Sequence, residues 1–196
     1  MLFNINGKKI LFIHIPKTGG TSIEKYFLET MGENMFCDNK YRESYLWGQR
    51  DGKFFQHLTM EEIFIQYKLL DIEQIDLIFT IVREPVSRFK SYSRWYIGNE
   101  KKNILEHLKT KSNDSHIRPQ TDYIKNFRDK VKIYKYESGL QDIINNVLKL
   151  NNIKPKTKLS HTLNRKKIKV SFSKEEIKKI EKFYKDDFLN FTYLLN

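Results

Sequence analysis

Short apolar runs alternate along the chain with segments in which apolar residues recur every three or four positions. The runs at residues 9–15, 77–82 and 131–136 are rich in β-branched and aromatic residues, which is typical of strands buried on both faces of a sheet. The segment after each run has the spacing of one apolar helix face. The residues on these three faces are Ile23, Tyr26, Phe27 and Met31, then Val86, Phe89, Tyr92 and Tyr96, then Leu140, Ile143, Ile144 and Val147.

Helix-start signals agree with this alternation. The first helix is predicted to begin near Thr21 or Ser22, and Pro85 suits the first position of the second. Capping boxes predict a further helix at residues 59–70 and a final helix from residue 173. Strands that alternate with helices indicate an α/β fold, with a central, mainly parallel sheet flanked by helices. The 196 residues show no internal repeat and no linker, so we expect a single domain over residues 1–196.

Charge and cysteine content narrow the class of protein. The chain has 36 basic and 24 acidic residues and a formal net charge of +12, which predicts attraction to polyanions without saying which. The single cysteine, Cys37, cannot form an intramolecular disulfide, so a reduced compartment is expected. The chain has no apolar stretch near the roughly 18 residues that span a bilayer. These features predict a cytoplasmic protein with no membrane span.

The stretch PKTGGTS, at residues 16–22, breaks the apolar pattern between the first strand and the first helix. In a strand–turn–helix unit, backbone N–H groups and the helix dipole at this turn favour an anion. Gly19 and Gly20 let the backbone approach a phosphate, while Lys17, Thr21 and Ser22 add charge and hydroxyl donors. The pattern predicts a phosphate cradle. It differs from GxxxxGK[ST], because the lysine precedes the glycines. The alternative is a tight turn with a surface lysine.

The second candidate segment is VREPVSRFKSY, at residues 82–92. Arg83 lies at the end of a predicted strand, and Ser91 lies about two turns into the next helix, so both reach one edge of the sheet. The guanidinium of an arginine is a planar fork for phosphate, and a serine adds a directional hydroxyl. The alternative is an Arg–Glu surface pair and an ordinary helical serine.

Together the two segments resemble the nucleotide-binding signatures of sulfotransferases that use 3′-phosphoadenosine 5′-phosphosulfate (PAPS). PKTGGTS resembles the 5′-phosphosulfate loop of that family, and VREPVSRFKSY resembles its 3′-phosphate site. HIPKTGGTS is closest to the branch that sulfates carbohydrate hydroxyls. FFQHLT at residues 54–59, HIRPQTDYI from residue 116 and KFYKDDFLNFTYL at the end of the chain add less specific likeness. The resemblance implies a P-loop-like fold, PAPS as the sulfuryl donor, a carbohydrate-type acceptor and no metal.

The resemblance also implies roles for individual residues. Lys17 would stabilise charge on the leaving phosphate, and Arg83 and Ser91 would hold the 3′-phosphate. The remaining donor-binding candidates are Thr18, Gly19, Gly20, Thr21 and Ser22 around the 5′-phosphate, with Arg165 and Lys166 in a late loop. For that late loop, an ordinary basic loop is an equal alternative.

Transfer near neutral pH needs a general base, and imidazole suits this task. His57 precedes a predicted helix and matches the position of the base in the family, so His57 is predicted to be the base, with His116 as the second choice. His116, Arg118 and Gln120 are also candidates for acceptor binding, because they lie in a polar segment, residues 98–121, that is read as a loop or a lid. His14 is expected in the core beside the site, and His107 is expected to face solvent.

Two other functions fit parts of the sequence. An ATP-dependent kinase would use the same cradle, but it would want an aspartate on a later strand for Mg²⁺, and LIFTIV has none. A basic module that binds polyanions would interleave basic residues with exposed aromatics, whereas the aromatics here fall at core spacing. No nucleic-acid partner is therefore expected. The sequence identifies neither the acceptor nor the oligomeric state.

Overall fold

The computed structural model describes residues 1–34, 36, 38–96, 104–110, 114–155, 158–159 and 169–195. Its main sheet has the strand order β1-β2-β5-β6, from β1 (Leu2–Ile5), β2 (Lys8–Ile13), β5 (Leu77–Val82) and β6 (Lys132–Lys135). The strands β2, β5 and β6 are parallel, and β1 pairs antiparallel to β2. The prediction of an α/β fold with a mainly parallel sheet is confirmed.

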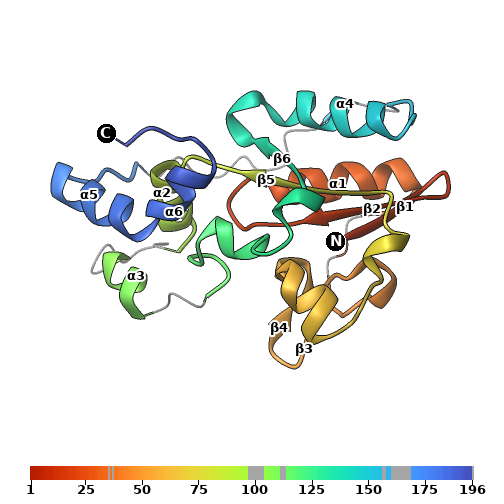
Figure 1. Cartoon of the computed structure of the whole chain (residues 1–196), viewed down its shortest axis with the longest axis horizontal. Helices are drawn as coiled ribbons and strands as arrows, with labels where there is room; N and C mark the ends of the chain where they lie inside the picture. The colour runs from red at the N-terminus through yellow and green to blue at the C-terminus, as the bar shows by residue number, and fades with distance from the viewer. Residues whose placement is uncertain are drawn as a thin grey trace.

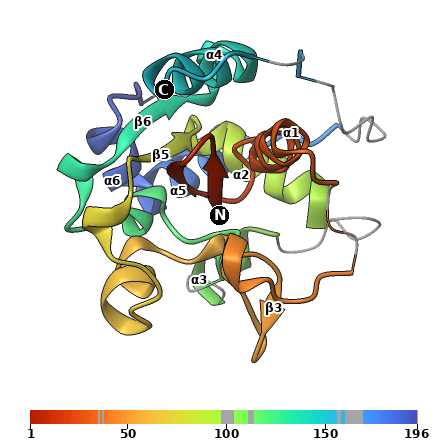
Figure 2. The same ribbon diagram turned by 90° about the vertical axis from the view of Figure 1, so that its right-hand side faces the viewer.

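Two helices cover one face of this sheet, α1 (Gly20–Met31) and α4 (Leu140–Leu150), as Figure 1 and Figure 2 show. Their buried residues pack on Phe12 and Phe79 of the central strands. The opposite face is covered by the chain between α1 and β5, which includes the hairpin of β3 (Gln49–Arg50) and β4 (Lys53–Phe54). The buried residues of this segment include Leu58, Met60 and Ile63, which contact the other side of the strands.

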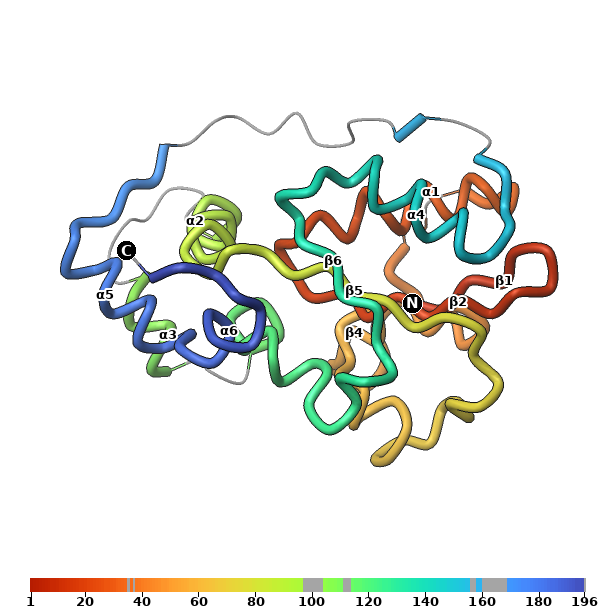
Figure 3. Tube along the Cα trace, turned by 45° about the horizontal axis from the view of Figure 1, so that its top comes forward, coloured from red at the N-terminus to blue at the C-terminus, as the bar shows by residue number. Residues whose placement is uncertain are grey.

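A third apolar cluster lies beyond the carboxyl end of β5, where the helices α2 (Pro85–Tyr96), α5 (Lys174–Phe183) and α6 (Lys185–Asn190) gather (Figure 3). Val86 and Phe89 of α2 pack there against Ile180 and Phe188. The last helices of the chain therefore pack at the same end of the sheet as the first glycine turn. No helix in the described part of the chain is long and apolar enough to cross a bilayer.

The structure departs from the sequence prediction in three places. The strand β1 was not predicted. The capping box of Thr59 and Glu62 forms, but it starts a short π-helix (Glu62–Gln66) that ends before the predicted residue 70, because Lys68 has a φ of 48°. Within residues 98–121, the described parts include short helices, Ile104–Glu106, α3 (His107–Thr110) and the start of Gln120–Tyr123, whereas residues 114–118 form turns and bends.

Candidate functional site

The predicted phosphate cradle connects β2 to α1 at the carboxyl end of the strand. Gly19, with a φ of 89°, is the N-cap of α1, and Lys17 also has a positive φ of 72°. Thr18 is buried, and its hydroxyl donates to the Ile15 carbonyl at 2.8 Å, which closes the turn from inside. The first turn of α1 has no acidic residue, and no described side chain caps its N-terminus. This end of the helix therefore has the electrostatics of an anion site.

His14 and Glu24 join the two arms of this turn. Both side chains are buried, and His14 Nδ1 lies 2.8 Å from Glu24 Oε1. The imidazole fills the space beside Gly20, where a Cβ would lie 2.0 Å from His14 Nε2. The expectation that His14 lies in the core beside the site is met. Gly20 is thus required by the histidine behind the loop, a reason that the sequence pattern does not reveal.

Gly20→Ala is expected to lower the free energy of unfolding by about 2–3 kcal/mol, because the new methyl group overlaps the His14 ring and the Glu24 bond restricts its escape. Urea unfolding monitored by circular dichroism measures this loss. Gly7→Ala is the matched control, since a Cβ there meets nothing within 4 Å and only the φ of 77° opposes it, at about 1 kcal/mol. Equal losses in the two variants would contradict the steric argument.

Arg83 lies directly after β5 and reaches back to the cradle. Its Nη1 donates to the Lys17 carbonyl at 3.3 Å, and its guanidinium lies 4.3 Å from the centroid of the Tyr136 ring. Its Nε is buried without a hydrogen-bond partner among the described residues, and burial lowers the pKa of Arg83. Both features fit a partly desolvated cation that an anionic ligand would satisfy. Ser91 is half-buried two turns along α2.

His57 packs directly against His14 on the other side of the turn. Its Nδ1 lies 3.2 Å from the His14 carbonyl oxygen, and the two ring centroids are 4.5 Å apart. A carbonyl only accepts, so this bond places the proton on Nδ1 and leaves the lone pair on Nε2. Burial lowers the pKa of His57 well below 6.5, and repulsion from His14 and His116 lowers it further. His57 is consequently a neutral imidazole with a defined tautomer.

A row of rings continues from His57 toward Lys17. The His116 centroid is 5.5 Å from that of His57, and the His116 ring stacks on Trp95 with centroids 4.5 Å apart and planes 3° apart. Lys17 Nζ lies 5.0 Å from the centroid of the Trp95 ring. The structure therefore brings the predicted lysine and both predicted bases into one cluster, through a tryptophan that no motif in the sequence indicates.

Comparison with known proteins decides the family. A model of the sulfotransferase family matches residues 2–103, which run from β1 past the end of α2 and include the cradle, His57, Arg83 and Ser91. The chain belongs to the sulfotransferase family. Searches of curated proteins and of solved structures found no match. Family membership supports transfer of sulfuryl groups to a hydroxyl-bearing acceptor.

Beyond the matched region, this sulfotransferase-family protein holds the segment of residues 114–121 against the site through buried side chains. Arg88 of α2 is 1 % exposed, and its guanidinium donates to three carbonyls, those of Pro16, Arg118 and His116, at 3.0, 3.0 and 3.4 Å. Asp187 of α6 is fully buried and accepts from the backbone amides of Gln120 and Thr121. Arg88 and Asp187 therefore connect the cradle, the segment and the last helix.

Two predicted acceptor-binding residues of this segment have structural partners. Gln120 is fully buried, and its side chain accepts from the Arg83 amide and donates to the Arg83 carbonyl, both at 2.8 Å. This geometry favours a role in fixing Arg83 over contact with an acceptor. Arg118 is partly buried and pairs with Glu62 at 3.3 Å.

His107, expected to face solvent, is half-buried instead, and its Nδ1 lies 2.8 Å from the Tyr92 hydroxyl.

The alternative to a phosphate site at Arg83 is a surface pair with Glu84. Its carboxylate instead accepts from the amides of Val86 and Ser87 at 2.8 and 2.7 Å, which caps the N-terminus of α2. This helix end is thus already occupied by an acidic side chain. The first turn of α1, by contrast, has no acidic residue and no described side-chain cap.

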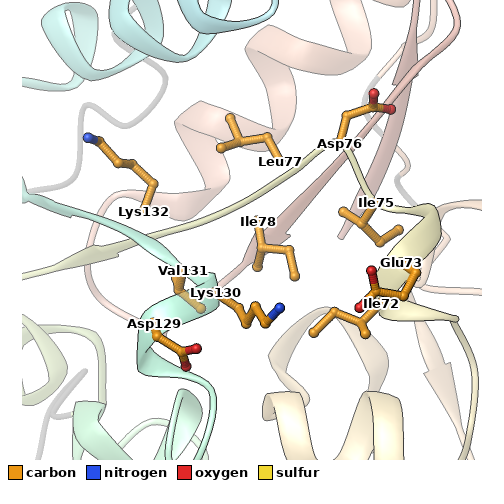
Figure 4. A pocket seen from close by; sticks show the side chains of 10 residues that line it. All are labelled: Ile72, Glu73, Ile75, Asp76, Leu77, Ile78, Asp129, Lys130, Val131 and Lys132. Atoms are coloured by element: carbon orange, nitrogen blue, oxygen red, sulfur yellow. The ribbon is translucent and has the colours of Figure 1, made fainter.

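A cavity of about 390 Å³ lies elsewhere, at the amino ends of β5 and β6 (Figure 4). Its walls include Ile75, Ile78 and Val131, together with acidic and basic side chains, and it contains none of the predicted site residues. The described residues hold no cluster of three or more His, Cys, Asp or Glu side chains that could bind a metal ion. The candidates Arg165 and Lys166 lie outside the described residues.

Proposed function

We propose that the protein transfers the sulfuryl group of PAPS to a hydroxyl of a carbohydrate-type acceptor, with His57 as the general base. The observation that carries the proposal is the bond between His57 Nδ1 and the His14 carbonyl, because it leaves the lone pair of Nε2 to accept a proton. His57 is preferred to His116. The hydrogen bond to the His14 carbonyl fixes the tautomer of His57, whereas the His116 ring is stacked on Trp95.

The residues of the cradle suit the donor nucleotide. The α1 N-terminus with Lys17, Thr21 and Ser22 would hold the 5′-phosphate end, and Thr18, Gly19 and Gly20 shape the turn. Arg83, with its unpaired buried Nε, and Ser91 would hold the 3′-phosphate. When bound, PAPS supplies the sulfuryl group and a nucleotide phosphate as the leaving group.

The chemistry assigned to the chain is proton transfer and charge stabilisation. His57 Nε2 takes the proton of the acceptor hydroxyl as its oxygen bonds to sulfur, while the bond from sulfur to the phosphate oxygen breaks. The ammonium of Lys17 faces the negative charge that develops on that phosphate. The products are the sulfate ester, 3′-phosphoadenosine 5′-phosphate and one proton, so charge and atoms balance. No step requires a metal.

The carbohydrate class of the acceptor rests on the resemblance and on the exposed rings beside the base. Phe54 is 39 % exposed with its centroid 6.4 Å from that of His57, and Trp95, which stacks on the neighbouring His116, is 45 % exposed. Aromatic side chains that expose apolar surface beside a polar catalytic group suit a ring with both an apolar face and hydroxyls.

Thermal unfolding with nucleotides tests the donor assignment. At about a hundred times its dissociation constant, 3′-phosphoadenosine 5′-phosphate is expected to add roughly 2.7 kcal/mol and raise the Tm by about 5–10 °C. AMP is expected to give a much smaller shift, since it lacks the 3′-phosphate, and Arg83→Ala should remove the difference between the two ligands. A shift with ATP and Mg²⁺ alone would contradict the proposal and favour a kinase.

A further inference from the structure

Trp95 occupies an unusual position for a large apolar side chain. It lies one helical turn beyond Ser91 on α2, and it remains 45 % exposed, whereas the other tryptophan of the chain, Trp47, is 4 % exposed in the core. Because residues four apart share one face of a helix, Trp95 and Ser91 face the same side. A half-exposed indole at this point is not explained by core packing.

The contacts of Trp95 connect two separate segments of the site. The indole lies 5.0 Å from Lys17 Nζ, in the cradle between β2 and α1, and it stacks face to face on His116, in the segment fixed by Arg88. The position of the indole is thus set by the His116 ring stacked on it and by the helix that carries it. An ammonium near an indole ring is attracted by the negative potential of the ring face, and tryptophan attracts cations more strongly than phenylalanine.

The charge state of His116 favours this arrangement. Burial is the main reason that its pKa falls to about 4; Asp114 opposes the shift, and the nearby Lys17 and Arg88 add to it. An imidazole that is neutral near pH 7 stacks on the indole without repelling the ammonium of Lys17. A lysine side chain has four rotatable bonds, so a fixed partner removes entropy that ligand binding would otherwise have to overcome.

We propose that Trp95 is a positioning residue that holds the ammonium of Lys17 ready for the 5′-phosphate of the donor nucleotide, with His116 as the support behind the indole. This inference rests on the proposed function, because it requires that Lys17 binds the 5′-phosphate.

The test compares two ligands by isothermal titration calorimetry: 3′-phosphoadenosine 5′-phosphate and adenosine 3′-phosphate, which lacks the 5′-phosphate. Trp95→Leu is expected to weaken binding of the first about three- to fivefold and to leave binding of the second unchanged. Trp95→Phe keeps an aromatic ring, so its affinity for 3′-phosphoadenosine 5′-phosphate should lie between those of the wild type and Trp95→Leu. Tyr96→Leu is the matched control, since Tyr96 is the next residue, is 47 % exposed and contacts His107 edge to face instead. In a Lys17→Met background, Trp95→Leu should have no further effect.

The outcomes separate this inference from the proposed function. If the wild-type protein does not bind 3′-phosphoadenosine 5′-phosphate, the proposed function fails and this inference fails with it. If the wild type binds and Trp95→Leu binds equally well, only the inference is overturned. Equal losses for both ligands would also overturn it, because Trp95 would then act on the nucleoside or on α2 rather than through Lys17.

Discussion

Replacing His57 with alanine is expected to lower the rate of sulfuryl transfer by about 10²–10⁴-fold and to leave nucleotide binding unchanged. The methyl group of alanine cannot take the proton from the hydroxyl group of the acceptor molecule. The cradle and Arg83, which are proposed to bind the nucleotide, are not changed by this substitution. The measurement is the release of 3′-phosphoadenosine 5′-phosphate from PAPS in the presence of carbohydrate acceptors, together with the thermal shift that the nucleotide product causes.

The pH profile gives this prediction a second readout. Because the pKa of His57 is lowered, its neutral form persists as the pH falls below 6.5, and kcat/KM should decrease only at a more acidic pH. A free imidazole on the surface would instead lose activity around pH 6.5. His107→Ala is the matched control, since His107 bonds to Tyr92 and should change neither rate nor profile. Wild-type turnover in His57→Ala would remove His57 from the role of base.

Arg88→Met is expected to lower the free energy of unfolding by about 3–4 kcal/mol, which corresponds to a fall in Tm of about 6–16 °C for a chain of this size. Methionine keeps much of the volume of arginine but donates no hydrogen bonds. The carbonyls of Pro16, His116 and Arg118 would lose their hydrogen-bond donor. Burial raises the pKa of Asp187, and the positive charge of Arg88, which lowers that pKa, would also be lost. Urea unfolding and thermal melts measure both quantities.

The control for this substitution is Arg94→Met, on the same helix but exposed, which should change stability by less than about 0.5 kcal/mol. Arg88→Lys separates charge from geometry, because one ammonium cannot reach three carbonyls that a planar guanidinium serves together. We expect Lys to restore less than half of the lost stability. A loss below about 1 kcal/mol in Arg88→Met would show that water or other groups satisfy these carbonyls.

Local patterns in the sequence were sufficient to predict most of the sheet and the glycine turn before α1. The run LIFTIV coincides with β5, and the glycine turn leads into α1 as the apolar spacing predicted. The strand β1 was missed, although Asn6-Gly7, both with positive φ, is the usual signal for a two-residue hairpin. The π-helix at Glu62–Gln66 was not predictable from the capping box, which fixes where a helix starts and not its type.

Long-range partners explain what the sequence could not predict in the site. Glu24 reads as an ordinary polar position of α1, and only the fold places it against His14. Arg88 lies inside the second motif, but its bonds to carbonyls 28, 30 and 72 residues away in sequence leave no trace in local spacing. In the sequence, Trp95 is an ordinary position of a predicted helix. Its contact with Lys17 depends on how the cradle and α2 pack together in the fold.

The backbone of residues 116–121 is fixed independently of the side chains that this segment carries. Its backbone is held by side chains that lie outside it, since Arg88 bonds to the carbonyls of residues 116 and 118 and Asp187 bonds to the amides of residues 120 and 121. An exchange of the Arg118 side chain would therefore leave these backbone hydrogen bonds in place. Under the proposed function, acceptor preference would then diverge, in evolution or by design, through a side chain exchanged on a fixed backbone.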